Sequence, residues 1–204
     1  MTDFDIPASW AVLAIGEPPK PLPWRATQRY GITPAPGTLG LVHDFLNTRS
    51  GGGVVPDLLS SPDTARQWAD DAFETWSTIR AGNDVPFTLD GKALPELRDL
   101  RDTLSTTNAF RVATDRRAVM LVTSTRDDGQ IDWQPAGVGA QRLISALLTE
   151  VLLAQHNGAW VKMRQCRDPR CLATFFDRTW NQRQIWHDTA AVISAKHPTS
   201  PVRR

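Results

Sequence analysis

Cysteine is scarce in this chain, with only two among 204 residues, and this excludes a disulfide-rich scaffold. No apolar run approaches the roughly 18 residues that a membrane-spanning helix needs. The first ten residues have neither the basic segment nor the apolar core of a secretory signal. We therefore expect a cytoplasmic protein without a membrane segment. The content of 41% hydrophobic and 22% charged residues is typical of a globular protein. The length of 204 residues suits one domain with a small appendage.

The net charge of +1 conceals an uneven distribution. Residues 162–204 contain nine Lys or Arg and three Asp or Glu, for a net +6, whereas residues 1–161 contain 14 and 19, for a net −5. Such asymmetry favours a polyanionic partner such as DNA, or a basic tail folded against an acidic body. A solvated charged face is the alternative.

The chain divides by composition into four segments. Residues 1–37 hold seven of the 15 prolines, which predicts an extended arm, with Trp10, Trp24 and Tyr30 available to pin it to the body. Compact structure is expected from Thr38, as a domain over residues 38–159. A change of composition near residue 160 predicts a second unit over 160–197, followed by a basic tail over 198–204.

Apolar spacing predicts an α+β protein that is mostly helical. Helices are expected within 39–48, from Pro62 to about residue 80, over 94–110 and 138–156, and over 180–196. A hairpin is expected from a strand at 118–123, a turn at 127–130 and a returning strand at 131–133. Two further short strands are expected on either side of the two cysteines.

The two cysteines, Cys166 and Cys171, lie on a predicted tight turn between those short strands. Such a turn can direct two thiolates at one zinc ion, and a structural site needs two further ligands. His187 and His197 are the remaining candidates in this part of the chain. Half-buried free cysteines are an equally good interpretation of the pair alone.

Two separated motifs carry a resemblance to a known family. The first is LVHDFLNT at residues 41–48, followed by Asp57-Leu58-Leu59 and Trp68. The second is the Cys-x4-Cys turn, then FFDR at residues 175–178, Asn181 and Trp186-His187. Together they resemble bacterial ABATE-domain proteins, also called CGNR zinc-finger proteins and described as stress-induced transcription regulators. Over about residues 38–196 the resemblance implies an ABATE-like helical body and a treble-clef-like, DNA-binding zinc finger.

The chain departs from the family at the zinc site. The third cysteine of the family falls on His187, and the fourth, which opens the Cys-Gly-Asn-Arg motif, falls on Val192. One interpretation is a zinc site of Cys166, Cys171 and His187, completed by His197, Asp188 or water. A second is a subdomain without zinc, held by its own aromatic core of Trp160, Phe175, Phe176, Trp180, Trp186 and Ile185. A local disulfide is the third.

Three functions remain open at this point. The first is a DNA-binding regulator with a ligand- or stress-sensing body, whose DNA contacts would come from Arg164, Arg170, Arg178, Asn181, Arg183 and Lys196. The second is an enzyme or small-molecule binder in which His43, Asp44 and Asn47 fix a ligand or exchange protons. For that trio, tying loops together is the competing structural role. The third is an interaction protein, for example a homodimer.

Overall fold

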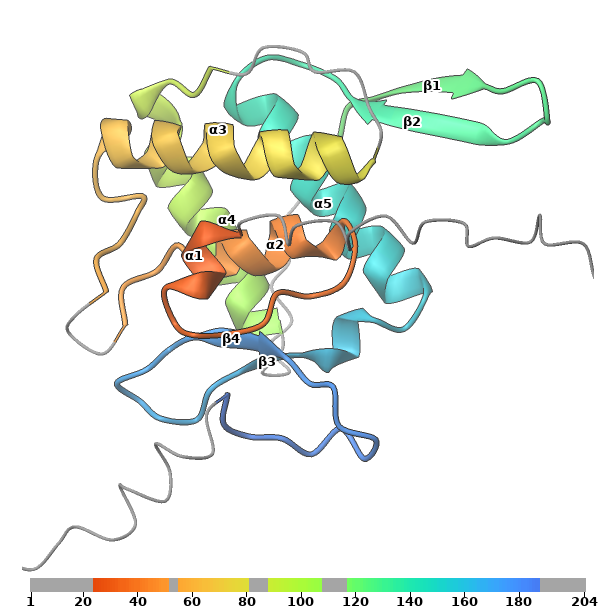
Figure 1. The fold of residues 1–204 in the computed structure, drawn as a ribbon. Helices are drawn as coiled ribbons and strands as arrows, with labels where there is room; N and C mark the ends of the chain where they lie inside the picture. The colour runs from red at the N-terminus through yellow and green to blue at the C-terminus, as the bar shows by residue number, and fades with distance from the viewer. Residues whose placement is uncertain (1–23, 52–54, 81–87, 108–116, 188–204) are drawn as a thin grey trace, which may run out of the picture.

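The computed structural model describes residues 24–51, 55–80, 88–107 and 117–187. The described helices are α1 (Arg25–Gln28), α2 (Leu39–Leu46), α3 (Pro62–Ile79), α4 (Leu94–Thr107) and α5 (Ala140–His156). The described strands are β1 (Leu121–Thr125), β2 (Ile131–Pro135), β3 (Met163–Gln165) and β4 (Thr174–Phe176). The strands pair as two antiparallel two-stranded sheets, so the fold is α+β as expected (Figure 1).

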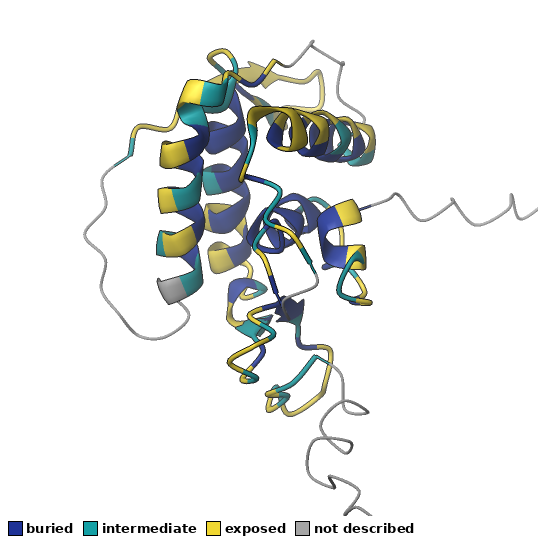
Figure 2. Cartoon of the chain, turned by 90° about the vertical axis from the view of Figure 1, so that its left-hand side faces the viewer, coloured by how far each residue is buried: buried dark blue, intermediate teal, exposed yellow. Residues whose placement is uncertain are grey.

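Helix α2 lies at the centre of the molecule (Figure 2), and all of its residues are buried. It contacts α1, α3, α4, α5 and β4. The helix expected within residues 39–48 is thus confirmed, and it is buried on every side. A helix that is apolar on most of its surface is one that other elements enclose.

The three longer helices begin and end close to the expected residues. Ser61 accepts a hydrogen bond from the Thr64 amide, and Pro62 occupies the first turn of α3, as a helix start requires. Helix α5 begins at Ala140 rather than residue 138, because Gly137 and Gly139 have positive φ angles that a helix cannot include. Among the described residues, no helix is long and apolar enough to cross a membrane.

The β1–β2 hairpin projects from the body beside the end of α3 (Figure 1). Gly129, at a φ of 81°, lies in the turn that the sequence predicted. Trp133 pairs with Thr123 across the strands and packs its ring against Trp76 of α3. Arg80 lies over the Trp133 ring at 3.9 Å and bonds the Trp133 carbonyl, so the base of the hairpin is tied to α3.

Residues 24–37 differ from the extended arm that their prolines predicted. They contain α1, and they enter the core through Trp24 and Ala26. The Trp24 indole lies directly on the backbone of α2, where a Cβ built on Gly40 would meet its ring at 2.5 Å. Residues 24–37 therefore belong to the same body as the helices that follow. Residues 1–23, including Trp10, lie outside the described part of the chain.

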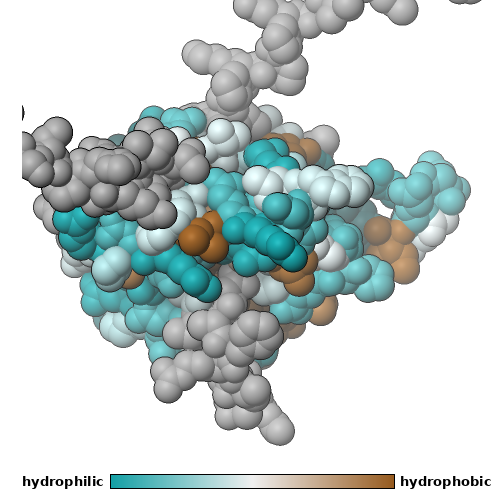
Figure 3. Space-filling view, turned by 90° about the horizontal axis from the view of Figure 1, so that it is seen from below, coloured by the Kyte–Doolittle hydropathy of each residue, from teal (hydrophilic) through white to brown (hydrophobic). Residues whose placement is uncertain are grey.

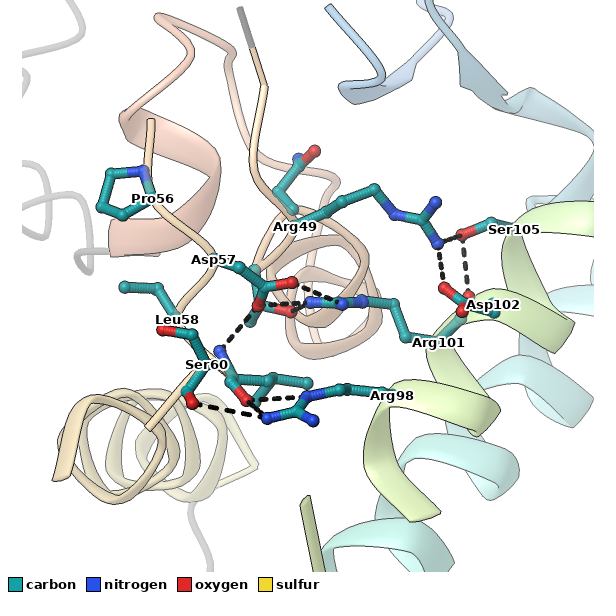
Figure 4. Close-up of polar contacts among 12 residues, drawn as sticks. Arg49, Pro56, Asp57, Leu58, Ser60, Arg98, Arg101, Asp102 and Ser105 are labelled. Atoms are coloured by element: carbon teal, nitrogen blue, oxygen red, sulfur yellow. Dashed lines mark hydrogen bonds and ion pairs between the residues drawn. The ribbon is translucent and has the colours of Figure 1, made fainter. Parts of the chain in front are cut away.

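Arginines of α4 hold the segment between α2 and α3 (Figure 4). Arg101 forms a bidentate ion pair with Asp57 and also donates to the hydroxyl of Thr48. Arg98 donates to the carbonyls of Leu59 and Ser60. Arg98 thereby satisfies the carbonyl of the buried residue Leu59, and Arg101 neutralises the Asp57 carboxylate.

The C-terminal part of the chain continues the same core. Trp160 and Met163 belong to the main apolar cluster, and β4 packs on α2. Strands β3 and β4 lie where the sequence predicted them. The helix expected over 180–196 is wrong for residues 180–187, which form a turn and an irregular loop. Residues 188–196 of that prediction, and the tail over 198–204, lie outside the described residues.

Candidate functional site

Cys166, Cys171 and His187 come together at the end of the β3–β4 hairpin. One donor atom from each lies within 4.8 Å of the other two, and the Cys171 Sγ atom is 3.4 Å from Nδ1 of His187. This is the set that the sequence analysis named for metal. A Cys–Cys–His group able to hold a metal ion is therefore present among the described residues.

The backbone between the two cysteines aims their side chains at one point. The Cys166 amide donates to the Ala173 carbonyl at 2.8 Å, which closes the hairpin next to β3. The Cys171 amide donates to the Asp168 carbonyl at 3.0 Å, which folds the intervening residues into a turn. Leu172 follows with a φ of 55°, a left-handed conformation unusual for a branched side chain. This local strain turns the chain back into β4 directly after the second cysteine.

His187 reaches the cysteines through a backbone contact further along the loop. The Arg167 amide donates to the Ile185 carbonyl at 3.0 Å, which lays the segment before His187 against the turn between the cysteines. Both cysteines are free thiols, so the structure does not contain the local disulfide that the sequence left open. The other proposed ligands, His197 and Asp188, lie outside the described residues, as does Val192.

The surroundings of Cys171 favour its protonated form. Partial burial, together with the adjacent Cys166 sulfur and Asp168, raises the pKa of the Cys171 thiol to about 11, although the Ala173 amide donates to its sulfur and opposes the rise. A metal ion would have to displace this proton, because the thiolate is the metal ligand.

The donor geometry fits a small tetrahedral ion. With Zn–S near 2.3 Å and Zn–N near 2.0 Å, a sulfur and a nitrogen on one zinc ion lie about 3.5 Å apart. The observed 3.4 Å between Cys171 Sγ and His187 Nδ1 is close to that separation. This one separation thus suits a small tetrahedral ion, and the other two are within 4.8 Å.

His43, Asp44 and Asn47 also come together, as their spacing on α2 suggests, but their polar atoms contact the protein's own loops. The Ala35 amide donates to Nδ1 of His43 at 2.9 Å, so the proton of the ring is on Nε2, which donates to the Thr174 carbonyl at 2.9 Å. Asn47 bonds both the amide and the carbonyl of Thr174. This arrangement fastens β4 to α2.

Asp44 ties α1 and α3 to the same helix. Its carboxylate accepts from the Thr27 amide at 2.7 Å and from the Trp68 indole at 2.8 Å. Burial raises the pKa of Asp44, although these donors favour the ionised form. Burial also lowers the pKa of His43 to about 4, and the charge of Arg178 adds to this, against the opposing effect of the Thr174 carbonyl. The trio has the contacts of the loop-tying role weighed in the sequence analysis.

The residues predicted to contact nucleic acid divide by their present contacts. Arg164 pairs with Asp177 at 3.5 Å, and Arg170 pairs with Asp168 at 3.5 Å. Arg178 donates to the Pro34 carbonyl, yet its side chain remains largely exposed. Arg183 and Asn181 are exposed on the loop after β4, where the Asn181 side chain accepts from the Arg183 amide. Lys196 lies outside the described residues.

Sequence reasoning missed the role of Asp177. This carboxylate is 0% exposed and accepts from the Thr179 amide and hydroxyl and from the Gln184 amide. Burial opposes its charge, but these donors and the nearby Arg164 outweigh burial and lower its pKa. Asp177 thereby organises the loop of residues 177–184. The available signal for a buried carboxylate was the position of Asp177 directly after the apolar residues Phe175 and Phe176.

The aromatic core proposed for a metal-free subdomain is wrong at Trp180. This side chain is 100% exposed, and Ile185 is also exposed, whereas Trp160 and Phe175 are buried. The segment therefore has less apolar support after β4 than its composition suggested.

A scan against protein-family models found no matching family, and a search of curated proteins found no match.

Proposed function

We propose that this protein is a DNA-binding transcription regulator whose C-terminal segment is held by zinc and presents its arginines to the phosphate backbone. The observation that carries the proposal is the convergence of Cys166, Cys171 and His187 inside a basic segment. The resemblance to ABATE-domain regulators, drawn from two separated motifs, points in the same direction.

Zinc suits this donor set better than a harder cation. Two sulfurs and an imidazole nitrogen are ligands that zinc prefers, whereas magnesium and calcium prefer oxygen. Bound zinc would close the turn between the cysteines and fix the segment that leads to His187. A closed metal site would supply the stability that the exposed side chains after β4 do not supply.

The charge of the described C-terminal residues supports a polyanionic partner. Residues 162–187 contain six basic and two acidic side chains, a net +4. Both acids already have arginine partners, Asp168 with Arg170 and Asp177 with Arg164. Asp177 is buried, so the charge offered outward is mainly positive. Exposed arginines release counterions from DNA when they bind its phosphates, and this drives salt-dependent association.

The body is assigned the sensing role by resemblance alone. The contacts of His43, Asp44 and Asn47 favour a structural role, so the alternative of an enzyme built on them gains no support.

Metal analysis tests the first half of the proposal. Elemental analysis of the purified protein is expected to give one zinc per chain. Cys166→Ser and His187→Ala should lose it, whereas His156→Ala, which changes an exposed histidine at the end of α5, should keep it. Zinc retained in His187→Ala would overturn this ligand set.

A salt series tests the second half. The anisotropy of a labelled random-sequence duplex is expected to report binding near 50 mM salt that weakens steeply as salt rises. Arg183→Gln should weaken it and reduce the salt slope by about one. The matched control is Arg66→Gln on α3, which makes the same charge change on the body and should leave binding intact. No binding at low salt would refute the proposal.

A further inference from the structure

Trp180 is displayed to solvent by a loop that is itself well fastened. The side chain is 100% exposed, the highest value among the exposed large apolar residues. It lies in the turn after β4, where the Gln182 amide donates to the Thr179 carbonyl at 3.2 Å. Gln182 has a φ of 48°, a conformation that side chains other than glycine rarely adopt.

The anchor of this loop is Asp177. Its buried carboxylate receives the Thr179 amide at 2.9 Å, the Thr179 hydroxyl at 2.5 Å and the Gln184 amide at 3.0 Å. Its own amide donates to the Lys162 carbonyl at 2.8 Å, which joins the loop to β3. A buried charge and a left-handed residue are thus both used to hold this turn. The backbone that carries the tryptophan is held before any partner arrives, which reduces the entropy cost of ordering the loop on binding.

The surroundings of Trp180 indicate the chemistry of that partner. Residues 178–183 read RTWNQR, so every chain neighbour of the indole is polar or basic. The part of the lower face that Figure 3 leaves uncovered is mostly hydrophilic, with small apolar spots. A protein-docking surface of useful size requires contiguous apolar area, and membrane insertion usually requires several apolar side chains together. A single exposed aromatic ring flanked in the sequence by Arg178 and Arg183 instead matches the platforms on which nucleobases stack.

We propose that Trp180 stacks on an unpaired nucleobase while Arg178 and Arg183 hold the adjacent phosphates. This inference rests on the proposed nucleic-acid function and adds a contact to a base. Stacking on tryptophan is tolerant of base identity, because every base has a π-face. The contact therefore contributes affinity for single-stranded or locally opened strands rather than recognition of one sequence.

The test compares two labelled strands with the same number of phosphates: a thymine 20-mer, and one in which the central bases are replaced by abasic sites. The full-length protein is expected to bind the thymine strand about tenfold more tightly. Trp180→Ala should bind both strands with the weaker affinity, and Trp180→Phe should restore part of the preference. Val161→Ala, which shortens another exposed apolar side chain of the same segment, should behave like the parent protein.

The outcomes separate this inference from the proposed function. Equal binding of the two strands by the parent protein, or an unchanged preference in Trp180→Ala, overturns the stacking contact while leaving DNA binding intact. Absence of binding to every strand and duplex overturns both. Anionic vesicles of phosphatidylserine and phosphatidylcholine form the last arm. Vesicle binding that depends on Trp180, with no preference for thymine, would assign the loop to a membrane surface and refute the proposal.

Discussion

The Nε2 atom of His43 lies 2.9 Å from the carbonyl oxygen of Thr174, which is 131 residues further along the chain. The bond joins the most buried helix to the strand that follows the cysteine turn. Asn47, one turn later on α2, bonds the same carbonyl at 2.9 Å and the Thr174 amide at 2.8 Å. Three hydrogen bonds in a dry environment therefore fix β4 on α2, in place of the partner strand that an edge of a two-stranded sheet lacks.

The buried imidazole makes stability depend on pH. His43 has a pKa of about 4 in the folded protein and an ordinary value of 6.5 when exposed. As pH falls from 6.5 to 4, the unfolded chain takes up a proton that the folded chain does not. The free energy of unfolding should fall over that interval by about 3 kcal/mol. Urea unfolding at a series of pH values measures it.

Substitution of that histidine gives the control. His43→Gln keeps a donor and an acceptor but cannot be protonated, so its stability should be lower at pH 7 and should vary less between pH 6.5 and 4. The opposite contribution of Asp44, whose raised pKa favours the folded state as pH falls, is common to both proteins and cancels in the difference. Parallel curves for the two proteins would show that His43 is not the titrating group.

Gly40 is predicted to resist the substitution that usually strengthens a helix. Gly→Ala in a helix interior commonly adds about 1 kcal/mol to stability. Here the added methyl would meet the Trp24 ring at 2.5 Å, so Gly40→Ala should destabilise the protein by about 2 kcal/mol. Thermal unfolding measures it. In a Trp24→Ala background the added methyl should cost much less, and an equal cost in both backgrounds would contradict the contact.

Loss of Arg101 should lower the free energy of unfolding by more than the loss of a surface arginine does. Its guanidinium bonds both oxygens of Asp57 and the Thr48 hydroxyl, and it is nearly buried (Figure 4). Arg101→Gln would leave Asp57 without its main partner, at an expected cost of about 2 kcal/mol after allowance for the partial exposure of Asp57. Urea unfolding gives the value, with Arg66→Gln as the surface control. A cost equal to that of the control would contradict the inferred role.

Metal affinity should rise with pH. The Cys171 thiol has a pKa of about 11, so at neutral pH a metal ion must release its proton on binding. Each unit of pH below that value should therefore weaken binding about tenfold through Cys171 alone. Competition with a chromophoric zinc chelator at pH 6.5 and 7.5 measures the change. An affinity that does not change with pH would exclude a thiolate ligand at this position.

Much of the helical architecture was predictable from apolar spacing. The leucines of α4 and the apolar residues of α5 recur every three or four residues over long segments. Proline, serine and glycine mark where the helices start or stop. The grouping of Cys166, Cys171 and His187 was also predictable, because the Cys-x4-Cys turn supplied two donors and the family resemblance aligned His187 with a third.

The failures occur where a buried carboxylate outside the segment decides its local structure. Helix α1 has only four residues, too few for apolar periodicity to predict it. It is held instead by Asp44, whose carboxylate accepts a hydrogen bond from the Thr27 amide. The expected start of the last helix, residues 180–187, is irregular because Asp177 draws the Thr179 and Gln184 amides to its carboxylate. The contact between Asp44 and Thr27 has no sequence signature of its own, and Asp177 was marked only by its place after two apolar residues.

The attachment of β4 to α2 has a mechanical consequence. Thr174 is bonded to the helix, and Asp177, three residues later, organises the loop that carries Trp180. The chain between them is a strand and a buried carboxylate, with no glycine to act as a hinge. The position of the basic loop is thus tied to that of α2, and a rotation of that helix would move the loop, and the backbone that carries Trp180, with it.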